Sequence, residues 1–537
     1  ASTTATGSQS ATLASISQTI TYSISDTAAN IVSNIGGLNE AVNITSTSSA
    51  TFAQAKVIED ATNSGSNTYN ISDTALNIAA GVGEDSIVLV DAGTVEATTS
   101  ATASEANTIA SLSQAVTYSI SDTATNVAGA TSTALNQAFN IVCTTDGTVA
   151  EVTTIESAIN TGTNTYNITD TAANIAGAGD AFVTKAVKVE VNDNANVTQA
   201  ETIAAFTKAV IYSISDSAGN ALATGGVAYN EAVNIEITGN LTVAKADIIK
   251  EASNSGSKTY VIEDSAAEIT GAVTGTTGAT ADVETLNGAT TVTANTNANF
   301  TQAATIAGIA KAIIYNISDE QANIPGSTTG ALNEAVNIVV TNNVTFAQAK
   351  IIDDATNSGS NTYNISDTST NLSTGIVTSV RAIDGAGTVI ASTNATGSQS
   401  AILASISQVI VYDISDTAAN IVANLGGLNE ARDITATDSC TFAQAKVIED
   451  ATNNRNISFN ISDSAANIVA GIGSDAAVIT AATSVAANTY ATKAELEIIG
   501  ANANVIVFSV KDTAANLAAA TAARILKAVN VIGTTDA

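Results

Sequence analysis

Short stretches in which apolar and polar residues alternate recur along the whole chain. In the first of them Ile20, Tyr22 and Ile24 alternate with small polar residues, so that one side of the stretch is apolar. A second stretch places Val42 and Ile44 on one side in the same way. A period of two is typical of a strand with one buried face. The pattern therefore predicts two short strands, near residues 20–25 and 42–44.

The segment between these strands has helical spacing. After Asp26 the apolar positions fall three, four and three residues apart, at Ala28, Ile31, Ile35 and Leu38. That spacing places them on one stripe of a helix. Asp26 stands where the pattern changes, and an Asp at such a point caps a helix by accepting from its free N–H groups. We expect the helix to end at the glycine pair 36–37, where a left-handed residue is favoured.

A second helix is predicted after the second strand. Thr51 is the expected N-cap, because Thr is a favoured capping residue. Behind it, Phe52, Ala55, Ile58 and Ala61 share one face, and Gln54, Lys56, Glu59 and Asp60 share the other. The pattern indicates an amphipathic helix that closes before the next strand at residues 69–73.

These two strands and two helices form a unit of about 48 residues that occurs eleven times. The aspartate after the first strand returns at intervals of 46 to 49 residues, with one interval of 55. We predict these aspartates as N-caps: Asp26, Asp73, Asp122, Asp170, Asp216, Asp264, Asp319, Asp367, Asp416, Asp463 and Asp512.

An aromatic residue lies four positions before each of these aspartates. The column is Tyr22, Tyr69, Tyr118, Tyr166, Tyr212, Tyr260, Tyr315, Tyr363, Tyr412, Phe459 and Phe508. Because Tyr22 shares strand parity with Ile24, we expect the column in the core, with each hydroxyl bonded to a partner or to water. A carbohydrate-binding stripe is the alternative interpretation.

Each half of the unit, called a half-repeat below, holds one strand and one short helix in about 24 residues. A strand plus a helix in roughly 20–29 residues is typical of a leucine-rich-repeat-like solenoid. We therefore predict an α/β solenoid with a parallel sheet, continuous over residues 1–537 as one domain of eleven repeats. The long interval predicts an enlarged surface loop near 274–294. The alternative is an all-β solenoid in which the segments after each aspartate are only turns.

Composition and charge narrow the function classes. The 49 acidic and 17 basic residues give a formal charge of −32, which disfavours nucleic acid and attracts cations such as Ca²⁺. No apolar run is long enough to insert into a membrane. The chain has no His, so imidazole bases and His metal sites are excluded. Nucleotide-binding and serine-hydrolase motifs are also missing. We predict that the chain is not an enzyme.

One acidic cluster is a candidate metal site. Glu190, Asn192, Asp193 and Asn194 supply the oxygen ligands that Ca²⁺ prefers. A polar loop is the alternative interpretation of these residues. The single aspartate of each repeat cannot supply the six or more oxygens that Ca²⁺ requires. Ca²⁺ is the one cofactor that the sequence suggests, and no other is expected.

Asn-x-Ser/Thr triplets suggest glycosylation of a secreted chain. Those in predicted loops, at Asn196, Asn343 and Asn394, are the candidate sugar sites. Many others lie inside the repeat strand, as at Asn70, where a ladder of hydrogen-bonded asparagines explains them equally well.

The two cysteines, Cys143 and Cys440, are 297 residues apart. Along a straight solenoid this separation exceeds the reach of a disulfide. We expect them to be free, buried or bonded between chains.

The Ile-Ser-Asp-Thr-Ala-Ala-Asn-Ile unit, together with the Thr-x-Ala-Gln-Ala helix start at Thr51 and Thr345, resembles repeats of large secreted prokaryotic proteins. These proteins are described as S-layer-like, hemolysin-type or giant adhesins. The resemblance covers essentially the whole chain. It implies export, deposition at the cell surface and, in many members, dependence on Ca²⁺. The nonapeptide Ca²⁺ repeats of such proteins are missing here.

Solenoids stay soluble as monomers when polar caps cover their ends, and neither end of this sequence has such a cap. Ala1 is expected to be a processed terminus or the start of an ordered portion of a longer chain. Open ends predict head-to-tail stacking of the chain with itself. The expected function is an extracellular structural subunit of a filament, sheath or surface layer. An adhesin stalk or ligand-binding surface module is the alternative.

Overall fold

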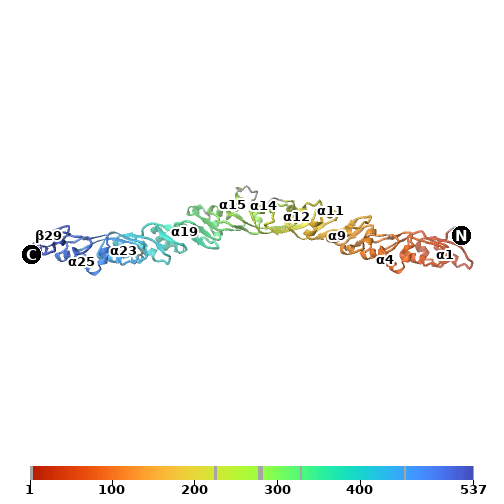
Figure 1. The fold of residues 1–537 in the computed structure, drawn as a ribbon, viewed down its shortest axis with the longest axis horizontal. Coiled ribbons are helices and arrows are strands. Elements are labelled where there is room, and N and C mark those ends of the chain that lie inside the picture. Colours follow the sequence, from red (N-terminus) through yellow and green to blue (C-terminus); the bar gives the residue numbers. More distant parts are fainter. Residues whose placement is uncertain (1–3, 223–225, 276–281, 327–328, 453–454, 536–537) are drawn as a thin grey trace. The chain divides into compact units, whose positions relative to one another are not determined.

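The protein is an α/β protein in which short parallel strands alternate with short helices. The computed structural model describes residues 4–222, 226–275, 282–326, 329–452 and 455–535. It divides into two compact units, residues 1–261 with 288–290 and residues 262–287 with 291–537. Within each unit the elements follow one another in sequence order (Figure 1). The helices confirm the α/β class and exclude the all-β alternative.

The strands of the first unit are β1 (Ile24–Asp26), β2 (Ile44–Ser46), β3 (Asn67–Thr68), β4 (Ile71–Asp73), β5 (Val95–Ala97), β6 (Val116–Thr117), β7 (Ile120–Asp122), β8 (Ile141–Cys143), β9 (Asn164–Thr165), β10 (Ile168–Asp170), β11 (Val189–Ala195), β12 (Ile211–Ser217) and β13 (Ile235–Leu241). Its helices are α1 (Gly7–Ala14), α2 (Ala28–Val32), η1 (Ile35–Gly37), α3 (Phe52–Glu59), α4 (Ala75–Glu84), α5 (Ser86–Val90), α6 (Ala103–Ile109), α7 (Ala124–Ala128), α8 (Ser132–Gln137), α9 (Val149–Glu156), α10 (Ala172–Ala178), α11 (Asp180–Val183), α12 (Val197–Ala204), α13 (Val227–Glu231) and α14 (Val243–Glu251). Strand β14 (Lys258–Asp264) and helix α16 (Val283–Gly288) contain residues of both units.

The strands of the second unit are β15 (Val292–Ala294), β16 (Ile313–Ile314), β17 (Ile317–Asp319), β18 (Ile338–Val340), β19 (Asn361–Thr362), β20 (Ile365–Asp367), β21 (Val389–Ala391), β22 (Ile410–Val411), β23 (Ile414–Asp416), β24 (Ile434–Cys440), β25 (Ile457–Asp463), β26 (Ser484–Ala487), β27 (Ile506–Val507), β28 (Val510–Thr513) and β29 (Val531–Thr534). Its helices are α15 (Ala266–Thr274), α17 (Phe300–Ile306), η2 (Gln321–Gly326), α18 (Thr329–Glu334), α19 (Phe346–Asp353), α20 (Ser369–Ser379), α21 (Arg381–Asp384), α22 (Gly397–Leu403), α23 (Ala418–Ala423), η3 (Leu425–Gly427), α24 (Phe442–Glu449), α25 (Ala465–Ser474), α26 (Ala476–Ala481), α27 (Lys493–Ile499), α28 (Ala514–Ala518) and α29 (Ala522–Ile525).

Consecutive half-repeats are joined by parallel strand pairing. Ile24 pairs with Ile44, and Ile44 in turn pairs with Asn67. Further along the same segment, Ala50 pairs with Ile71. Residues 46–49 therefore bulge outward between two paired positions. The same irregularity lies between Glu190 and Asn194 in β11.

This bulge distinguishes the two halves of each repeat. We call the half that carries it, with the helix that follows, the bulge half-repeat, as in β2 and α3. The other half, whose strand ends in the aspartate column, is the aspartate half-repeat, as in β1 and α2. The two alternate along both units.

The aromatic column lies in the core, as predicted. Every member is at most 3% exposed, from Tyr22 at 3% to Phe508 at 2%. The hydroxyl of Tyr118 donates to the carbonyl of Ala134 over 2.8 Å, and that of Tyr212 donates to Ala228 over 2.8 Å. Each of these bonds joins one half-repeat to the next. The carbohydrate-binding alternative is wrong for this column, because a buried ring cannot contact a sugar.

The second predicted helix is confirmed. Helix α3 begins after the N-cap Thr51, whose side chain accepts from the N–H of Gln54. The first predicted helix is shorter than its apolar stripe. It ends at Val32, Ile35 is 63% exposed, and Gly37 lies in the 3₁₀ helix η1 rather than in a left-handed turn. A Cβ on Gly37 would lie 2.4 Å from the Ser10 carbonyl carbon, so glycine is needed there for close packing.

The predicted loop near 274–294 is partly wrong. Residues 276–281 lie outside the described residues, but the later part forms helix α16 and strand β15. Val292 pairs with Ile262 in a parallel ladder, so the extra residues do not interrupt the pairing. In the described part of the chain, no helix is both long and apolar enough to cross a membrane.

Candidate functional site

The aspartate column forms the most regular polar site of the molecule. One carboxylate oxygen of Asp26 accepts from the N–H of Thr27 over 2.8 Å and from the Asn30 side chain over 2.9 Å. The other oxygen accepts from the N–H of Gly7 over 3.0 Å. Gly7 is the first residue of helix α1 in the preceding bulge half-repeat. A single carboxylate therefore ties two half-repeats together.

Among the described residues, the same bond to the preceding helix recurs in at least ten repeats. The donor N–H and the accepting carboxylate are Gly7 and Asp26, Phe52 and Asp73, Ala103 and Asp122, Val149 and Asp170, Val197 and Asp216, Phe300 and Asp319, Phe346 and Asp367, Gly397 and Asp416, Phe442 and Asp463, and Lys493 and Asp512. Each bond satisfies an N–H that the first turn of a helix leaves without an intrahelical partner.

The prediction that these aspartates are the N-caps of the helices that follow them is wrong. In nine repeats the N-cap is the next residue: Thr27, Thr74, Thr123, Thr171, Ser265, Thr368, Thr417, Ser464 and Thr513. After Asp216 the chain turns without a helix, and after Asp319 a 3₁₀ helix begins at Gln321. The hydroxyl residue caps its own helix, which leaves the carboxylate to bond the neighbouring helix.

Hydrogen bonding lowers the pKa of several aspartates in this column. The pKa of Asp26 lies below its ordinary value because the Asn30 amide and the N–H groups of Gly7 and Thr27 stabilise the charged form. At Asp122 burial acts in the opposite direction. There the bonds from Asn126, Ala103 and Thr123 outweigh burial, and the pKa is again lowered. Asp26 and Asp122 are therefore ionised at neutral pH.

Side chains in the bulges accept from the first N–H of the helices in the aspartate half-repeats. The N–H of Ala28, the first residue of α2, donates over 3.1 Å to the hydroxyl of Ser48 in the next bulge. Equivalent bonds join Ala75 to Thr99, Ala124 to Thr145, Ala172 to Asp193, Ala266 to Thr296, Gln321 to Asn342, Ser369 to Thr393, Ala418 to Asp438 and Ala465 to Thr489. Sequence reasoning missed this role. A small polar residue at one bulge position in each repeat was the available signal.

The candidate metal residues lie in one of these bulges. Asp193 accepts from the N–H of Ala172 over 2.7 Å, and Glu190 accepts from Lys188 over 2.5 Å. Asn192 and Asn194 are exposed beside them. Ion pairing to Lys188 and the bond from Ala172 use carboxylate oxygens that Ca²⁺ would otherwise bind. Among the described residues no group of three or more acidic or cysteine side chains is placed to hold a metal ion.

A surface cavity of about 420 Å³ adjoins this bulge. It is lined by Glu190 to Asn194 together with Ile211, Tyr212, Ser213 and Val233. Its walls combine carboxylates and amides with aliphatic side chains. The metal site stays a prediction, and its residues also fit the polar-loop alternative.

The three loop sequons are all exposed. Asn196 is also the N-cap of α12, where its side chain accepts from the N–H of Gln199 over 2.8 Å. Asn343 and Asn394 lie in bulges. Sequons within strands take part in a ladder, since the Asn337 side chain donates to that of Asn316 over 2.8 Å. Glycosylation of the three exposed residues stays a prediction.

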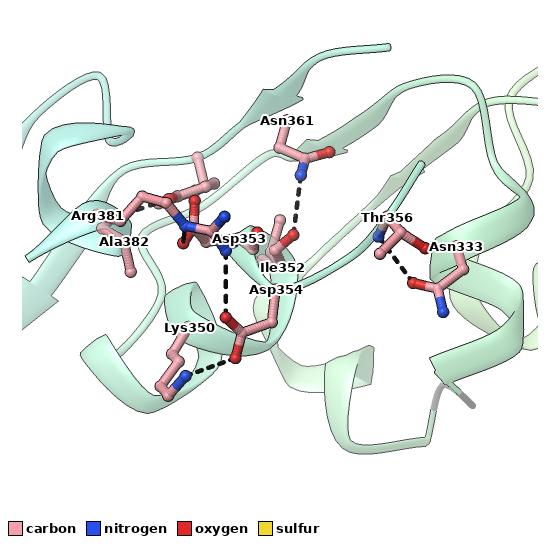
Figure 2. A network of polar contacts seen from close by, with 10 residues as sticks. Asn333, Lys350, Ile352, Asp353, Asp354, Thr356, Asn361, Arg381 and Ala382 are labelled. Carbon is pink, nitrogen blue, oxygen red and sulfur yellow. Dashed lines mark hydrogen bonds and ion pairs between the residues drawn. The ribbon is translucent and has the colours of Figure 1, made fainter. Parts of the chain in front are cut away.

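Ion pairs join neighbouring helices on the helical side of the sheet. Figure 2 shows Arg381 of α21 beside the carboxylates of Asp353 and Asp354 at the end of α19, with Lys350 also directed at Asp354. The Arg381 Nε donates to Asp353 over 2.7 Å. Lys446 and Asp475 form a comparable pair at 2.6 Å.

Both cysteines are free thiols. Cys440 is fully buried at the end of β24, and Cys143 is partly buried at the end of β8. Burial raises the pKa of each thiol to about 11. Thiols with so high a pKa are poor nucleophiles at neutral pH.

Comparison with known proteins finds no family model that matches this chain, and no curated protein matches it either.

Proposed function

We propose that this chain is a non-enzymatic structural protein of the cell exterior, a solenoid that assembles end to end into a filament, sheath or surface layer. The observation that supports the proposal is the contact between consecutive half-repeats, called the junction below, which recurs along the chain. Each half-repeat binds the next through a parallel ladder and through a side-chain cap on the first helical N–H. A surface built to bind the next half-repeat of its own chain has the shape and hydrogen-bonding groups to bind one from another molecule.

The strand β29 illustrates such a surface. Val531 and Ile532 in β29 are 46% and 37% exposed, whereas Ile44 at the position equivalent to Val531 is fully buried. Val531 pairs with Val510 on one side only among the described strands. In the proposed assembly, a strand of a second copy pairs with β29 and buries these side chains.

Placement outside the cell is supported by the resemblance to secreted repeat proteins and by the exposed sequons at Asn196, Asn343 and Asn394. The acidic surface supports a role for Ca²⁺ in neutralising contacts between molecules. In such an assembly the half-repeats themselves form the structure, so no catalytic group is needed.

An adhesin stalk or ligand-presenting module is the second candidate. The observation that favours it is the cavity beside the bulge of β11, where Glu190 and Asp193 lie near Ile211. A module of this kind would stay dispersed and hold a small polar ligand there.

Negative-stain electron microscopy of the purified chain, with Ca²⁺ and then with chelator, tests the proposal. Ordered filaments or sheets are expected with Ca²⁺. Val531→Asp should abolish them, because it places a carboxylate in the contact. Val377→Asp is the matched control, since Val377 is 74% exposed on α20 and away from any strand edge. Isolated particles at every concentration, with and without Ca²⁺, would overturn the end-to-end proposal.

A further inference from the structure

The outer face of the sheet carries one set of three paired residues in each repeat. The first comes from an aspartate half-repeat strand, the second from the next bulge half-repeat strand, and the third from the strand after that. In the first repeat these are Ser25, Thr45 and Thr68. Strand alternation turns them away from the core, because their neighbours Ile24 and Ile44 are fully buried. We call such a set an outer triad.

The outer triads of the second unit are almost uncharged. Their second and third members are Thr293 and Ile314, Val339 and Thr362, Ile390 and Val411, Thr435 and Ser458, and Ala486 and Val507. Ile314, Val411 and Val507 are 52%, 38% and 50% exposed. A row of exposed β-branched aliphatic side chains is unusual on a surface otherwise rich in acids.

The same positions in the first unit also include exposed aliphatic side chains, Val142 and Ile211 at 36% and 42%, but they differ in charge. They hold Thr45 and Thr68, Glu96 and Thr117, Val142 and Thr165, and Glu190 and Ile211, followed by Glu236. Three of these residues are glutamates. The repeat thus tolerates a carboxylate at the second position, and the second unit has none there.

The first residues of the triads are a second difference between the two units. In the second unit they are Glu263, Ser318, Ser366, Ser415 and Ser462, and Lys511 occupies the next equivalent position beside Ile532. A negative charge therefore stands at one end of this row and a positive charge at the other. Small serines lie between them and permit close approach.

We propose that the outer triads of the second unit bind a second copy of this chain, in an antiparallel side-by-side dimer. Two copies related by a two-fold axis near Val411 would place Glu263 of each opposite Lys511 of the other. This contact is separate from the end-to-end contact of the proposed function.

The charge of the molecule identifies the partner. Carboxylates within an interface repel an acidic partner. The repulsion is far smaller when the partner is neutral. With a net charge of −32, another copy of the chain is itself an acidic partner. A face with few carboxylates reduces the repulsion between two such copies. Two acidic side chains beside the triad of Ser415 are already bonded: Asp413 accepts from the Arg432 side chain over 2.8 Å, and Asp416 accepts from the N–H of Gly397 over 3.0 Å.

Sedimentation velocity of the full chain over a range of concentrations tests the proposal. The experiment uses the Val531→Asp background, in which end-to-end contact is removed. A dimer is expected. Val411→Glu should raise its dissociation constant by about a hundredfold, because the carboxylate is desolvated without a partner. The matched control, Thr117→Glu, makes the same change at the third triad position of the first unit and should leave the dimer intact.

A charge exchange tests the orientation. Glu263→Lys alone and Lys511→Glu alone should each weaken the dimer by about tenfold, and the double variant should restore it. A monomer at all concentrations, an equal effect of Val411→Glu and Thr117→Glu, or a double variant as weak as the single ones would overturn the proposal. Circular dichroism confirms that each variant is folded. Filaments that persist in Val411→Glu, when Val531 is intact, would show that the end-to-end proposal stands even if this one fails.

Discussion

The two kinds of half-repeat use different side chains to satisfy the first N–H of the helix in the preceding half-repeat. In both, a side chain from the following half-repeat accepts from the first N–H of a helix. The bulge half-repeat helices are held by a carboxylate, as Phe52 is by Asp73, whereas the aspartate half-repeat helices are mostly held by a hydroxyl, as Ala75 is by Thr99. The carboxylate makes two further bonds to its own helix start, to Thr74 and Asn77. The comparison indicates that a junction made by a carboxylate is stronger than one made by a hydroxyl, and that only the carboxylate junctions depend on pH.

The largest expected change in the free energy of unfolding comes from a comparison of one carboxylate junction with one hydroxyl junction. Asp73 is 8% exposed, and Asp73→Ala leaves three donors unpaired, so we expect a loss of about 3 kcal/mol. Thr99→Ala removes one bond at an exposed bulge and should cost about 1 kcal/mol. Urea unfolding followed by circular dichroism measures both. Equal losses would contradict the ranking of the two junctions.

The next prediction concerns the packing of a bulge half-repeat helix against an aspartate half-repeat helix. Gly471 of α25 lies against the Phe442 ring of α24, and an added Cβ would be 2.3 Å from a ring carbon. Gly471→Val should destabilise the protein by about 2 kcal/mol through overpacking. Gly473, two residues on in the same helix, has no atom within 4 Å of an added Cβ. Gly473→Ala should be neutral or stabilising by up to about 1 kcal/mol in the same urea assay. A similar loss in both variants would indicate that the helix itself, rather than the contact, is sensitive.

Acidification should weaken only the carboxylate junctions. Because the folded-state pKa of Asp122 is lowered, its stabilising contribution is complete above the unfolded-state value of about 3.9 and is lost as pH falls through the folded-state pKa. The urea midpoint should therefore fall steeply below about pH 4. Asp122→Asn should lower the midpoint at pH 7 and reduce its change between pH 7 and pH 2. An unchanged pH dependence would mean that this carboxylate does not stabilise the junction.

The smallest effect is expected for the ion pairs between helices. Lys446 lies 2.6 Å from Asp475, but its side chain is 43% exposed. Exposed pairs of this kind contribute little and are screened by salt. Lys446→Ala should lower the thermal midpoint slightly in dilute buffer and not at all in about 1 M NaCl. A large loss that persists in salt would show that Lys446 stabilises the junction by packing.

Much of the fold could be predicted from the sequence because the pattern repeats. Alternation around Tyr22 and the spacing after Thr51 recur often enough to predict that the strands, the second helix and the buried aromatic column exist, although β1 covers only Ile24–Asp26. The aspartates were correctly expected to accept from the free N–H groups of a helix start, but the wrong helix was assigned to them. That helix belongs to the neighbouring half-repeat, 19 residues earlier in the case of Gly7 and Asp26. A local sequence window cannot reveal such a bond.

The bulge was harder to predict for a related reason. Glu190, Asp193 and their neighbours have the composition of a cation site, and in the sequence nothing connects Asp193 to Ala172. Only the offset between strands, which sets Glu190 beside Ile211 and Asn194 beside Ser213, turns the side chain of Asp193 toward that N–H. Pairing register is a tertiary property, so the role of this residue followed from the structure alone.

Hydrogen–deuterium exchange followed by mass spectrometry tests the central claim, that carboxylates of one half-repeat hold the helix starts of the preceding one. Asp73→Ala should accelerate exchange in the peptide that contains Phe52, at the start of α3. The peptide that contains Ala28, which is held by the Ser48 hydroxyl, should exchange as in the native chain. Unchanged exchange at Phe52, or equal acceleration at both helix starts, would contradict the account.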